Sequence, residues 1–397
     1  MQTTHTTHAA WWAAAAFALP LAATATEPDP EAASSVVLYG TVDVGFVHFT
    51  GVPAAGDGAP VTAWGLASSI GSASALGVRG RSVLRPGLTL DFTAETGFCA
   101  VGLNQIGVDA DDPAQTFCSG AGFMQRKAEL GLSGGAGRIS AGLQPTLLAL
   151  REGDVDAFED GYAGAVGNLS LVSTNRPGLG LSRVAQALSW VSPALGSLHL
   201  SAQYSFNAGR HGPPFGSEAS VPRAWSVDLK HDAAGLLLGA SVAQYRNFRY
   251  ALADDTPYLD GHYRIWMAYL RAPLFGGLLG NALVQRNTAD GSDGRETVWS
   301  IGLALPVGTT RWMASIGHYA SSMAPLPQRV DESRAWQYAL GWRCDLSRRT
   351  QVHVSYAFIR NAAADATHAG TTLSPAPGGA VTGVDSHGFA LGLTHRF

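Results

Sequence analysis

The sequence predicts an all-β protein, a transmembrane antiparallel 16-stranded β-barrel, and three observations support this fold class. The chain of 397 residues is only 14% charged, about half of the ~25% that is typical of soluble domains. Its mean hydropathy is nevertheless just +0.07, and after residue 25 no segment approaches the ~18–20 apolar residues of a spanning helix. Apolar and polar residues alternate along the chain, and the connections between the alternating runs are long and short in turn.

Residues 1–25 are typical of a signal peptide. An unbroken apolar run extends from Ala9 to Leu21, and Ala-Thr-Ala at Ala23 to Ala25 predicts cleavage after Ala25. Because no Lys or Arg precedes the apolar run, a short N-terminal membrane anchor is the alternative. The remaining chain is divided into a lead-in at 26–34 and a barrel at 35–397.

The period of two is clearest where one face of a run is apolar and the other is polar or small. From Leu198 to Phe206, for example, Leu200 and Tyr204 share a face that His199 and Ser201 do not. Sixteen strands are expected, at 35–48, 75–82, 88–99, 125–133, 138–145, 183–192, 198–206, 223–231, 236–249, 260–271, 278–288, 295–305, 310–323, 333–345, 351–361 and 385–397.

The connections predict an outer-membrane layout. Every second connection has four to six residues, whereas those between them reach 37 residues. Tight turns at one end and long loops at the other are typical of outer-membrane barrels with an even number of strands. Sixteen tilted strands enclose a lumen about 32 Å wide, which side chains alone cannot fill. A loop must therefore narrow it, and the third and longest loop, 146–182, is the candidate for folding into the lumen.

This loop carries an acidic segment, 151–160, which is read either as a solvated surface loop or as one side of the channel constriction. The acidic candidates for the constriction are Asp154, Asp156, Glu159 and Asp160.

The opposite side of the constriction is assigned from strand phase. Arg79, Arg81 and Arg138 lie on the inward face, as do Asp43 and Glu95. The same reasoning adds Lys127, Glu129, Asp228, Lys230, Arg264, Arg343 and Arg396 to the inward set. A wall with more basic than acidic residues, facing an acidic loop, predicts a transverse field and an anion preference.

Several motifs resemble the general porins of β-proteobacterial outer membranes. They are Val37 to Asp43, Leu76 to Gly80, Glu95 to Phe98, Gln125 to Gly134 and the C-terminal segment Leu391 to Phe397. The resemblance covers nearly the whole mature chain. It implies a homotrimer of 16-stranded barrels with the third loop folded inward, embedded in outer-membrane lipid. It also implies that Phe397 is part of the signal read by the barrel-assembly machinery.

The chain departs from the family pattern at two wall positions. Arg81-Ser82 stands where the family usually has acidic residues, and Gly142-Leu143-Gln144 lacks a usual arginine. Arg126 matches the family motif but has an outward phase, so we expect it at the rim, turned inward.

Other function classes find little support. A net charge of −4 argues against nucleic-acid binding, and no spacing of Cys or His suggests a metal or cofactor site. Cys99 and Cys118 are close enough in the chain to close a loop as a disulfide. The segment Gly131 to Gly135 matches G-x-S-x-G but leads into a turn rather than a helix, so no enzyme activity is expected.

The sequence therefore predicts passive diffusion of small hydrophilic solutes and ions. The alternatives are a substrate-specific channel with a saturable binding site and, from another class, an outer-membrane enzyme.

Overall fold

The computed structural model describes most of the barrel and much of the loop that enters it. The described residues are 34–52, 59–101, 124–159, 161, 163–170, 172, 181–208, 222–251, 257–290, 294–322, 333–362, 373–376 and 383–397. The predicted signal peptide and most of the lead-in lie outside them. Within the described part of the chain, no helix is long and apolar enough to span a membrane.

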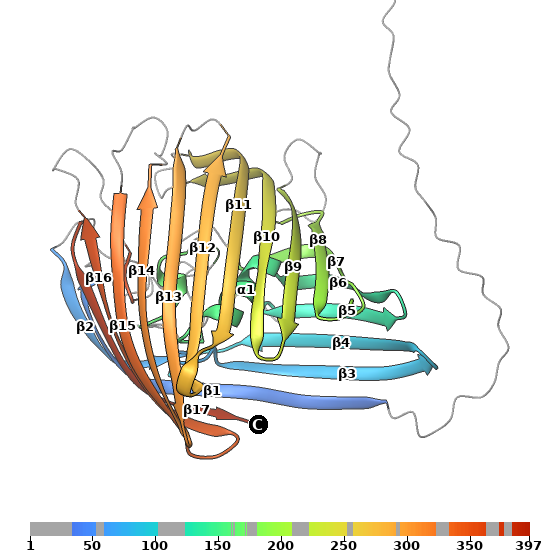
Figure 1. Cartoon of the computed structure of the whole chain (residues 1–397), viewed down its shortest axis with the longest axis horizontal. Helices are drawn as coiled ribbons and strands as arrows, with labels where there is room; N and C mark the ends of the chain where they lie inside the picture. Colours follow the sequence, from blue (N-terminus) through green and yellow to red (C-terminus); the bar gives the residue numbers. More distant parts are fainter. Residues whose placement is uncertain are drawn as a thin grey trace, which may run out of the picture.

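All the described strands belong to one antiparallel sheet that closes on itself (Figure 1). The closing strand is β1 (Ser35–Val52), whose residues 41–49 pair with β17 (Ser386–Arg396). The other strands are β2 (Val61–Ser68), β3 (Ala75–Arg85), β4 (Leu88–Gly97), β5 (Lys127–Gly134), β6 (Gly137–Pro145), β7 (Arg183–Val191), β8 (Leu198–Ser205), β9 (Arg223–Ala233), β10 (Leu236–Ala251), β11 (Pro257–Pro273), β12 (Leu279–Ala289), β13 (Arg295–Val307), β14 (Thr310–Ser321), β15 (Ser333–Asp345) and β16 (Thr350–Ala362).

Strands β2 and β3 occupy a single position around the barrel. Strand β1 pairs with β3 through residues 35–41 and with β2 through residues 44–52, along the edge opposite β17. Seventeen strands therefore fill sixteen positions, and the predicted closed 16-stranded barrel is confirmed. The expectation that 49–74 is entirely a loop is wrong, because Val61–Ser68 pairs with the upper half of β1.

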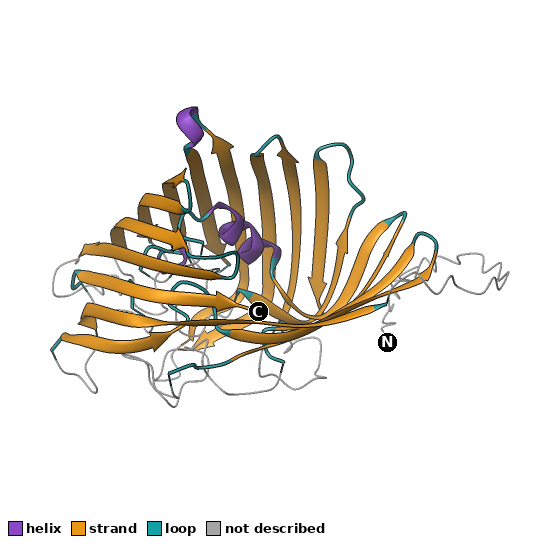
Figure 2. Cartoon of the chain, turned by 90° about the horizontal axis from the view of Figure 1, so that it is seen from below, coloured by secondary structure: helices purple, strands orange, loops and turns teal. Residues whose placement is uncertain are grey.

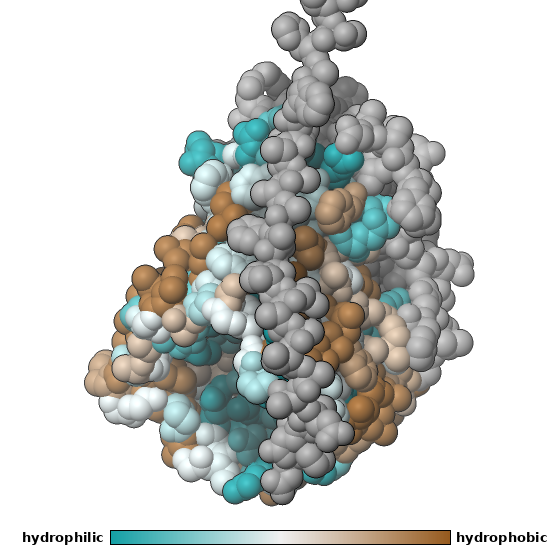
Figure 3. All heavy atoms as spheres, turned by 90° about the vertical axis from the view of Figure 1, so that its right-hand side faces the viewer, coloured by the Kyte–Doolittle hydropathy of each residue, from teal (hydrophilic) through white to brown (hydrophobic). Residues whose placement is uncertain are grey.

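The sixteen predicted strands all occur, with ends within four residues of those expected. Burial alternates along them: in β16, Ser355 and Ala357 are buried, whereas Tyr356 between them is exposed. Large apolar side chains are exposed on the outer face, and Figure 3 shows hydrophobic residues on the outer surfaces beside a hollow with hydrophilic residues. An apolar outer face around a polar lumen is what a lipid environment requires.

The described part of the loop between β6 and β7 lies inside the ring of strands (Figure 2). It begins with α1 (Leu147–Val155) and includes the 3-10 turn η1 (Val166–Asn168); a second 3-10 turn, η2 (Phe275–Gly277), lies in the connection between β11 and β12. The helix α1 starts at Thr146, whose hydroxyl accepts a hydrogen bond from the backbone N–H of Ala149 at 3.2 Å. It contacts β8 to β12 from the lumen side.

Three wall glycines make room for the rest of this loop. A Cβ on Gly302 of β13 would lie 2.7 Å from Ala157, one on Gly317 of β14 would lie 2.5 Å from Leu169, and one on Gly341 of β15 would lie 2.7 Å from Phe158. These separations are too short for any side chain. The loop is therefore fitted against β13 to β15 at three points. We call the strands β8 to β15, against which the loop packs, the covered wall, and β3 to β6 the open wall.

Candidate functional site: the channel wall and the inward loop

Two acidic residues of the loop hold its own backbone. Asp156 is buried and accepts hydrogen bonds from the backbone N–H groups of Phe158, at 3.0 Å, and Val166, at 3.2 Å. Glu152 is also buried and accepts a hydrogen bond from the Ser170 hydroxyl at 2.6 Å. A carboxylate that bridges two loop segments fixes the loop, so the structure places Asp156 in the loop framework rather than on an open channel surface.

A third acidic residue, Asp154, takes part in an ion-pair network that docks α1 on the covered wall. Its carboxylate pairs with Arg151, whose Nε donates to the buried carboxylate of Asp228 on β9 at 3.0 Å. Tyr269 donates to the same Asp228 carboxylate at 2.7 Å, and Arg271 donates to the backbone carbonyl of Asp154 at 3.0 Å. Burial opposes the charge on Arg151, but the carboxylates of Asp228 and Asp154 outweigh it and raise the pKa of Arg151. The pair therefore stays charged.

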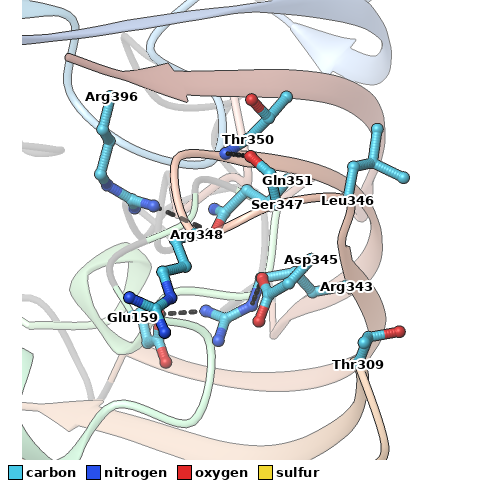
Figure 4. Close-up of a pocket in the computed structure, with 10 residues that line it drawn as sticks. All are labelled: Glu159, Thr309, Arg343, Asp345, Leu346, Ser347, Arg348, Thr350, Gln351 and Arg396. Carbon is cyan, nitrogen blue, oxygen red and sulfur yellow. Dashed lines mark hydrogen bonds and ion pairs between the residues drawn. The ribbon is translucent and has the colours of Figure 1, made fainter.

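The fourth, Glu159, lies at the tip of the described loop with an exposed side chain. Its carboxylate forms ion pairs with Arg311 of β14 and with Arg343 of β15. Figure 4 shows the pair with Arg343. The backbone of Glu159 has φ +53°, a left-handed conformation that is uncommon for a residue with a side chain. Asp160, the last of the predicted acidic residues, lies outside the described residues.

On the open wall, Glu95 is engaged by two partners. The Tyr39 hydroxyl donates to it at 2.9 Å and Arg126 Nε donates to it at 2.7 Å. Arg126 precedes β5 and turns inward at the end of the strand, as its match to the family motif suggested and its strand phase alone did not. The Arg183 side chain holds this corner by donating to the Arg126 carbonyl at 3.0 Å.

Arg138 lies among carboxylates. Its guanidinium bonds to both oxygens of Asp91, with the Nε contact at 3.2 Å, and to Glu129 at 2.9 Å. Glu129 also pairs with Lys127 at 3.0 Å. Two cations and two carboxylates therefore meet here, and this part of the wall presents little net charge.

Arg79 and Arg81 differ from Arg138. Both are exposed, and among the described residues neither takes part in an ion pair. The guanidinium of Arg79 lies 5.3 Å from the centroid of the Tyr39 ring, a cation–π arrangement that leaves its charge unneutralised.

Asp43 does not line the open channel. It lies on the inward face of β1 but is fully buried, because the turn between β2 and β3 covers it. Its carboxylate accepts from the backbone N–H groups of Ile70, at 2.6 Å, and Gly71, at 3.1 Å, and contacts His353 Nε2 at 3.1 Å and the Thr394 hydroxyl. These partners come from the turn, β16 and β17, so Asp43 joins the segments at which the barrel closes.

The assignment of Arg264 to the inward face is wrong. On β11 it is Tyr263, Ile265 and Met267 that are buried, and Arg264 is exposed on the outside. The physical reason is the loop: α1 packs on β11, where the inward residues Tyr263, Ile265 and Met267 are apolar or aromatic, so the usual polar-in pattern is reversed on this strand.

Two functional candidates were not found from the sequence. Arg311 stands on the inward face of β14, and Arg348 lies in the short turn between β15 and β16. Strand phase could have found Arg311, whereas no periodicity applies to a turn. Arg348 lines a cavity of about 630 Å³ at the short-turn end, together with Glu159, Thr309, Arg343, Asp345, Leu346, Ser347, Thr350, Gln351 and Arg396 (Figure 4). Arg311 does not line this cavity but pairs with Glu159, which does.

The C-terminus and the cysteines complete the list of predicted residues. The backbone of Phe397 exchanges hydrogen bonds with that of Gly40, at 3.0 and 3.2 Å, so the last residue is held beside β1. Cys99 is disulfide-bonded and Cys344 is a free thiol. Cys118, the expected partner of Cys99, lies outside the described residues.

Comparison with known proteins agrees with the closed barrel. A family model described as Gram-negative porin matches residues 10–364. Outer membrane porin protein 32 of Delftia acidovorans is 27% identical over 388 residues, which span 96% of this chain and 99% of the relative.

Solved structures show the same fold. The anion-selective porin from Comamonas acidovorans matches with a TM-score of 0.71 at 23% identity, over 92% of this chain and 100% of that one. OmpT of Vibrio cholerae, in a trimer form, matches with a TM-score of 0.60 at 14% identity, over 92% and 100% of the two chains. The chain therefore belongs to the Gram-negative porin family, and it is a non-enzymatic β-barrel channel of the outer membrane.

Proposed function

We propose that this outer-membrane porin passes small hydrophilic solutes with a preference for anions. The observation that carries the proposal is an imbalance among the inward charges. The described acidic residues of the loop and of the open wall are engaged by arginines, a lysine, a serine hydroxyl or backbone N–H groups. Arg79, Arg81, Arg348 and Arg396 form no ion pair within the described residues. Excess fixed positive charge attracts permeating anions and repels cations.

We further propose that Arg79 and Arg81 border the narrowest part of the channel, with Glu95, Arg126 and Arg138 beside them. The loop is packed on the covered wall, so the free cross-section lies towards the open wall. Only charges within a Debye length of about 10 Å act on a passing ion. Exposed, unpaired arginines in that space therefore have the largest effect on selectivity. The relative from Comamonas acidovorans, which is described as anion-selective, is in line with this proposal.

The test is the zero-current potential of purified protein in a planar bilayer under a tenfold gradient of potassium chloride. We expect the sign that corresponds to a larger permeability for chloride than for potassium. Arg264→Gln is a suitable control, because it removes one positive charge from the outer face. A potential of the opposite sign would refute the anion preference.

We propose that the mature protein forms a homotrimer after export and cleavage behind Ala25, with Phe397 as part of its assembly signal. The trimer form described for OmpT of Vibrio cholerae and the exposed apolar side chains on the outer face of β1 to β5 are in line with this assembly. Purified protein should migrate as an SDS-resistant oligomer that opens in three equal conductance steps. Single-step openings would contradict the trimer.

A further inference from the structure

We propose that the cavity at the short-turn end is a saturable binding site for small dianions, and that Glu159 is a tethered anion that competes for it. We call this cavity, with Arg311 beside it, the basic vestibule; Arg343, Arg348 and Arg396 line the cavity, and Arg311 pairs with the lining residue Glu159. The inference rests on the proposed passage of anions only in that the ligand must enter the lumen. It goes beyond selectivity, because it predicts binding, competition and saturation.

The first support is what already occupies the vestibule. The Glu159 carboxylate forms ion pairs with Arg311 and Arg343, each through a separate oxygen. A carboxylate seated between two guanidinium groups shows that the pair can bind an oxyanion. Since Glu159 belongs to the loop and the arginines to the wall, this anion can leave without any change in the barrel.

The second support is the charge that Glu159 leaves uncompensated. Four guanidinium groups surround two carboxylates, Glu159 and Asp345, so the vestibule retains a net charge of two positive. Figure 4 shows Arg343, Arg348 and Arg396 converging on the same space as Glu159. When the Glu159 carboxylate swings away, Arg311 and Arg343 are free for one charge of an incoming dianion, and Arg348 and Arg396 are placed for the other.

The third support is preorganisation of the site. Arg396 donates to the side-chain oxygen of Gln351 at 3.1 Å, which fixes its direction. The Ser347 hydroxyl oxygen accepts from the backbone N–H groups of Arg349 and Thr350, both at 3.1 Å, so its own proton is available to a ligand. Side chains that are held before binding lose less conformational freedom when a ligand arrives.

The fourth support is the backbone of Glu159. A left-handed conformation for a residue with a side chain is unfavourable, and such strain is concentrated at ligand-binding and switching positions. The Glu159 side chain is 43% exposed, and exposed ion pairs contribute little to stability. The tethered carboxylate is therefore held weakly enough for a solute to replace it.

The experiment measures chloride current through the whole protein in a planar bilayer, at constant ionic strength, while sulfate or succinate is added. Both probes are dianions at neutral pH; sulfate carries its charges on one centre and succinate on two separated carboxylates. We expect at least one of them to reduce the current along a saturating curve. Block by succinate alone would indicate that the two charges of the ligand bind to separate arginine pairs. Block by sulfate alone would indicate that both charges bind to one pair.

Variants then locate the site. Glu159→Gln should lower the half-blocking concentration by about fivefold, the size expected for the loss of one exposed ion pair. Arg348→Gln should raise it by a similar factor, and Arg348→Lys, which keeps the charge, should restore part of the effect. The matched control is Arg349→Gln, which removes a charge from the same turn but does not line the cavity.

Migration as an SDS-resistant oligomer, like the unmodified protein, shows that a variant is folded. The proposal is overturned if neither probe gives saturation, or if Glu159→Gln and Arg349→Gln both behave like the unmodified protein. The zero-current potential is recorded in the same bilayers. Anion preference without saturable block would refute the binding site but not the proposed function. Saturable block in a cation-preferring channel would refute the proposed function but not the binding site.

Discussion

The covered wall and the open wall face the same lumen but use their charges differently. On the covered wall, Asp228 and Arg343 bind groups of the inward loop, and apolar residues and glycines fill the space between them. On the open wall, Glu95 and Arg138 pair with neighbours on the wall itself, and Arg79 and Arg81 remain exposed. One wall therefore anchors the constriction, and the other supplies the charge that a solute meets.

The largest effect is expected on the covered wall, at Asp228. Replacing Asp228 by Ala removes the buried partner of Arg151, Tyr269 and Ser241. Leaving a buried charge without its partner costs about 3–5 kcal/mol, so the free energy of unfolding in a urea titration should fall by that amount. Asp232→Ala is the control, because its carboxylate is 42% exposed and, within the described residues, pairs only with Lys230 at 3.4 Å. Equal losses in both variants would show that α1 is not anchored here.

A somewhat smaller effect is expected for Gly341→Val, which places a side chain where Phe158 packs. Overpacking typically costs about 1–3 kcal/mol, and here it should push the loop into the lumen and reduce the single-channel conductance. Leu340→Val, one residue earlier on the outer face, provides the comparison. Normal conductance in Gly341→Val would mean that the loop is not seated on this glycine.

On the open wall we expect a change of selectivity with little change of stability. Glu95→Gln removes one negative charge from the open wall beside Arg126, so the net positive charge that faces the lumen rises by one. The ratio of anion to cation permeability should rise by about twofold. Asp232→Asn, outside the constriction, should leave the ratio as it is. A fall in the ratio for Glu95→Gln would indicate that Arg126 does not act on permeating ions.

The smallest effect is expected outside the lumen. Arg286 is exposed next to Trp266 on the outer face of the neighbouring strand. Arg286→Gln should therefore change neither conductance nor selectivity in bilayer recordings. A clear loss of anion preference would show that outward charges also set the field in the channel.

The same contrast explains how much could be predicted from the sequence. Strands that face lipid on one side and water on the other keep a period of two, so 333–345 was predicted with both ends correct. Strand β2 was missed because it is short and because a turn separates it from β3, the strand with which it shares one position around the barrel. The helix α1 was missed because its nine residues lie inside a long loop and gain their stability from contacts with the wall.

Site residues followed the same rule. Arg79 and Arg81 face inward, as their strand phase indicated. They are also exposed to water, because nothing in the described structure covers them. Arg264 was misplaced because the loop makes the lumen face of β11 apolar, and Asp43 is buried because a turn folds over it. Phase gives the direction of a side chain, but only tertiary packing decides whether it meets water.

The central claim is that the exposed arginines of the open wall set the anion preference, and the double variant Arg79→Gln, Arg81→Gln tests it most directly. Its zero-current potential in a potassium chloride gradient should move from the anion-preferring value towards zero or beyond. The free energy of unfolding should fall by no more than about 1 kcal/mol, since neither side chain has an ion pair to lose within the described residues and only the cation–π contact between Arg79 and Tyr39 is removed. An unchanged potential in the double variant would contradict the account.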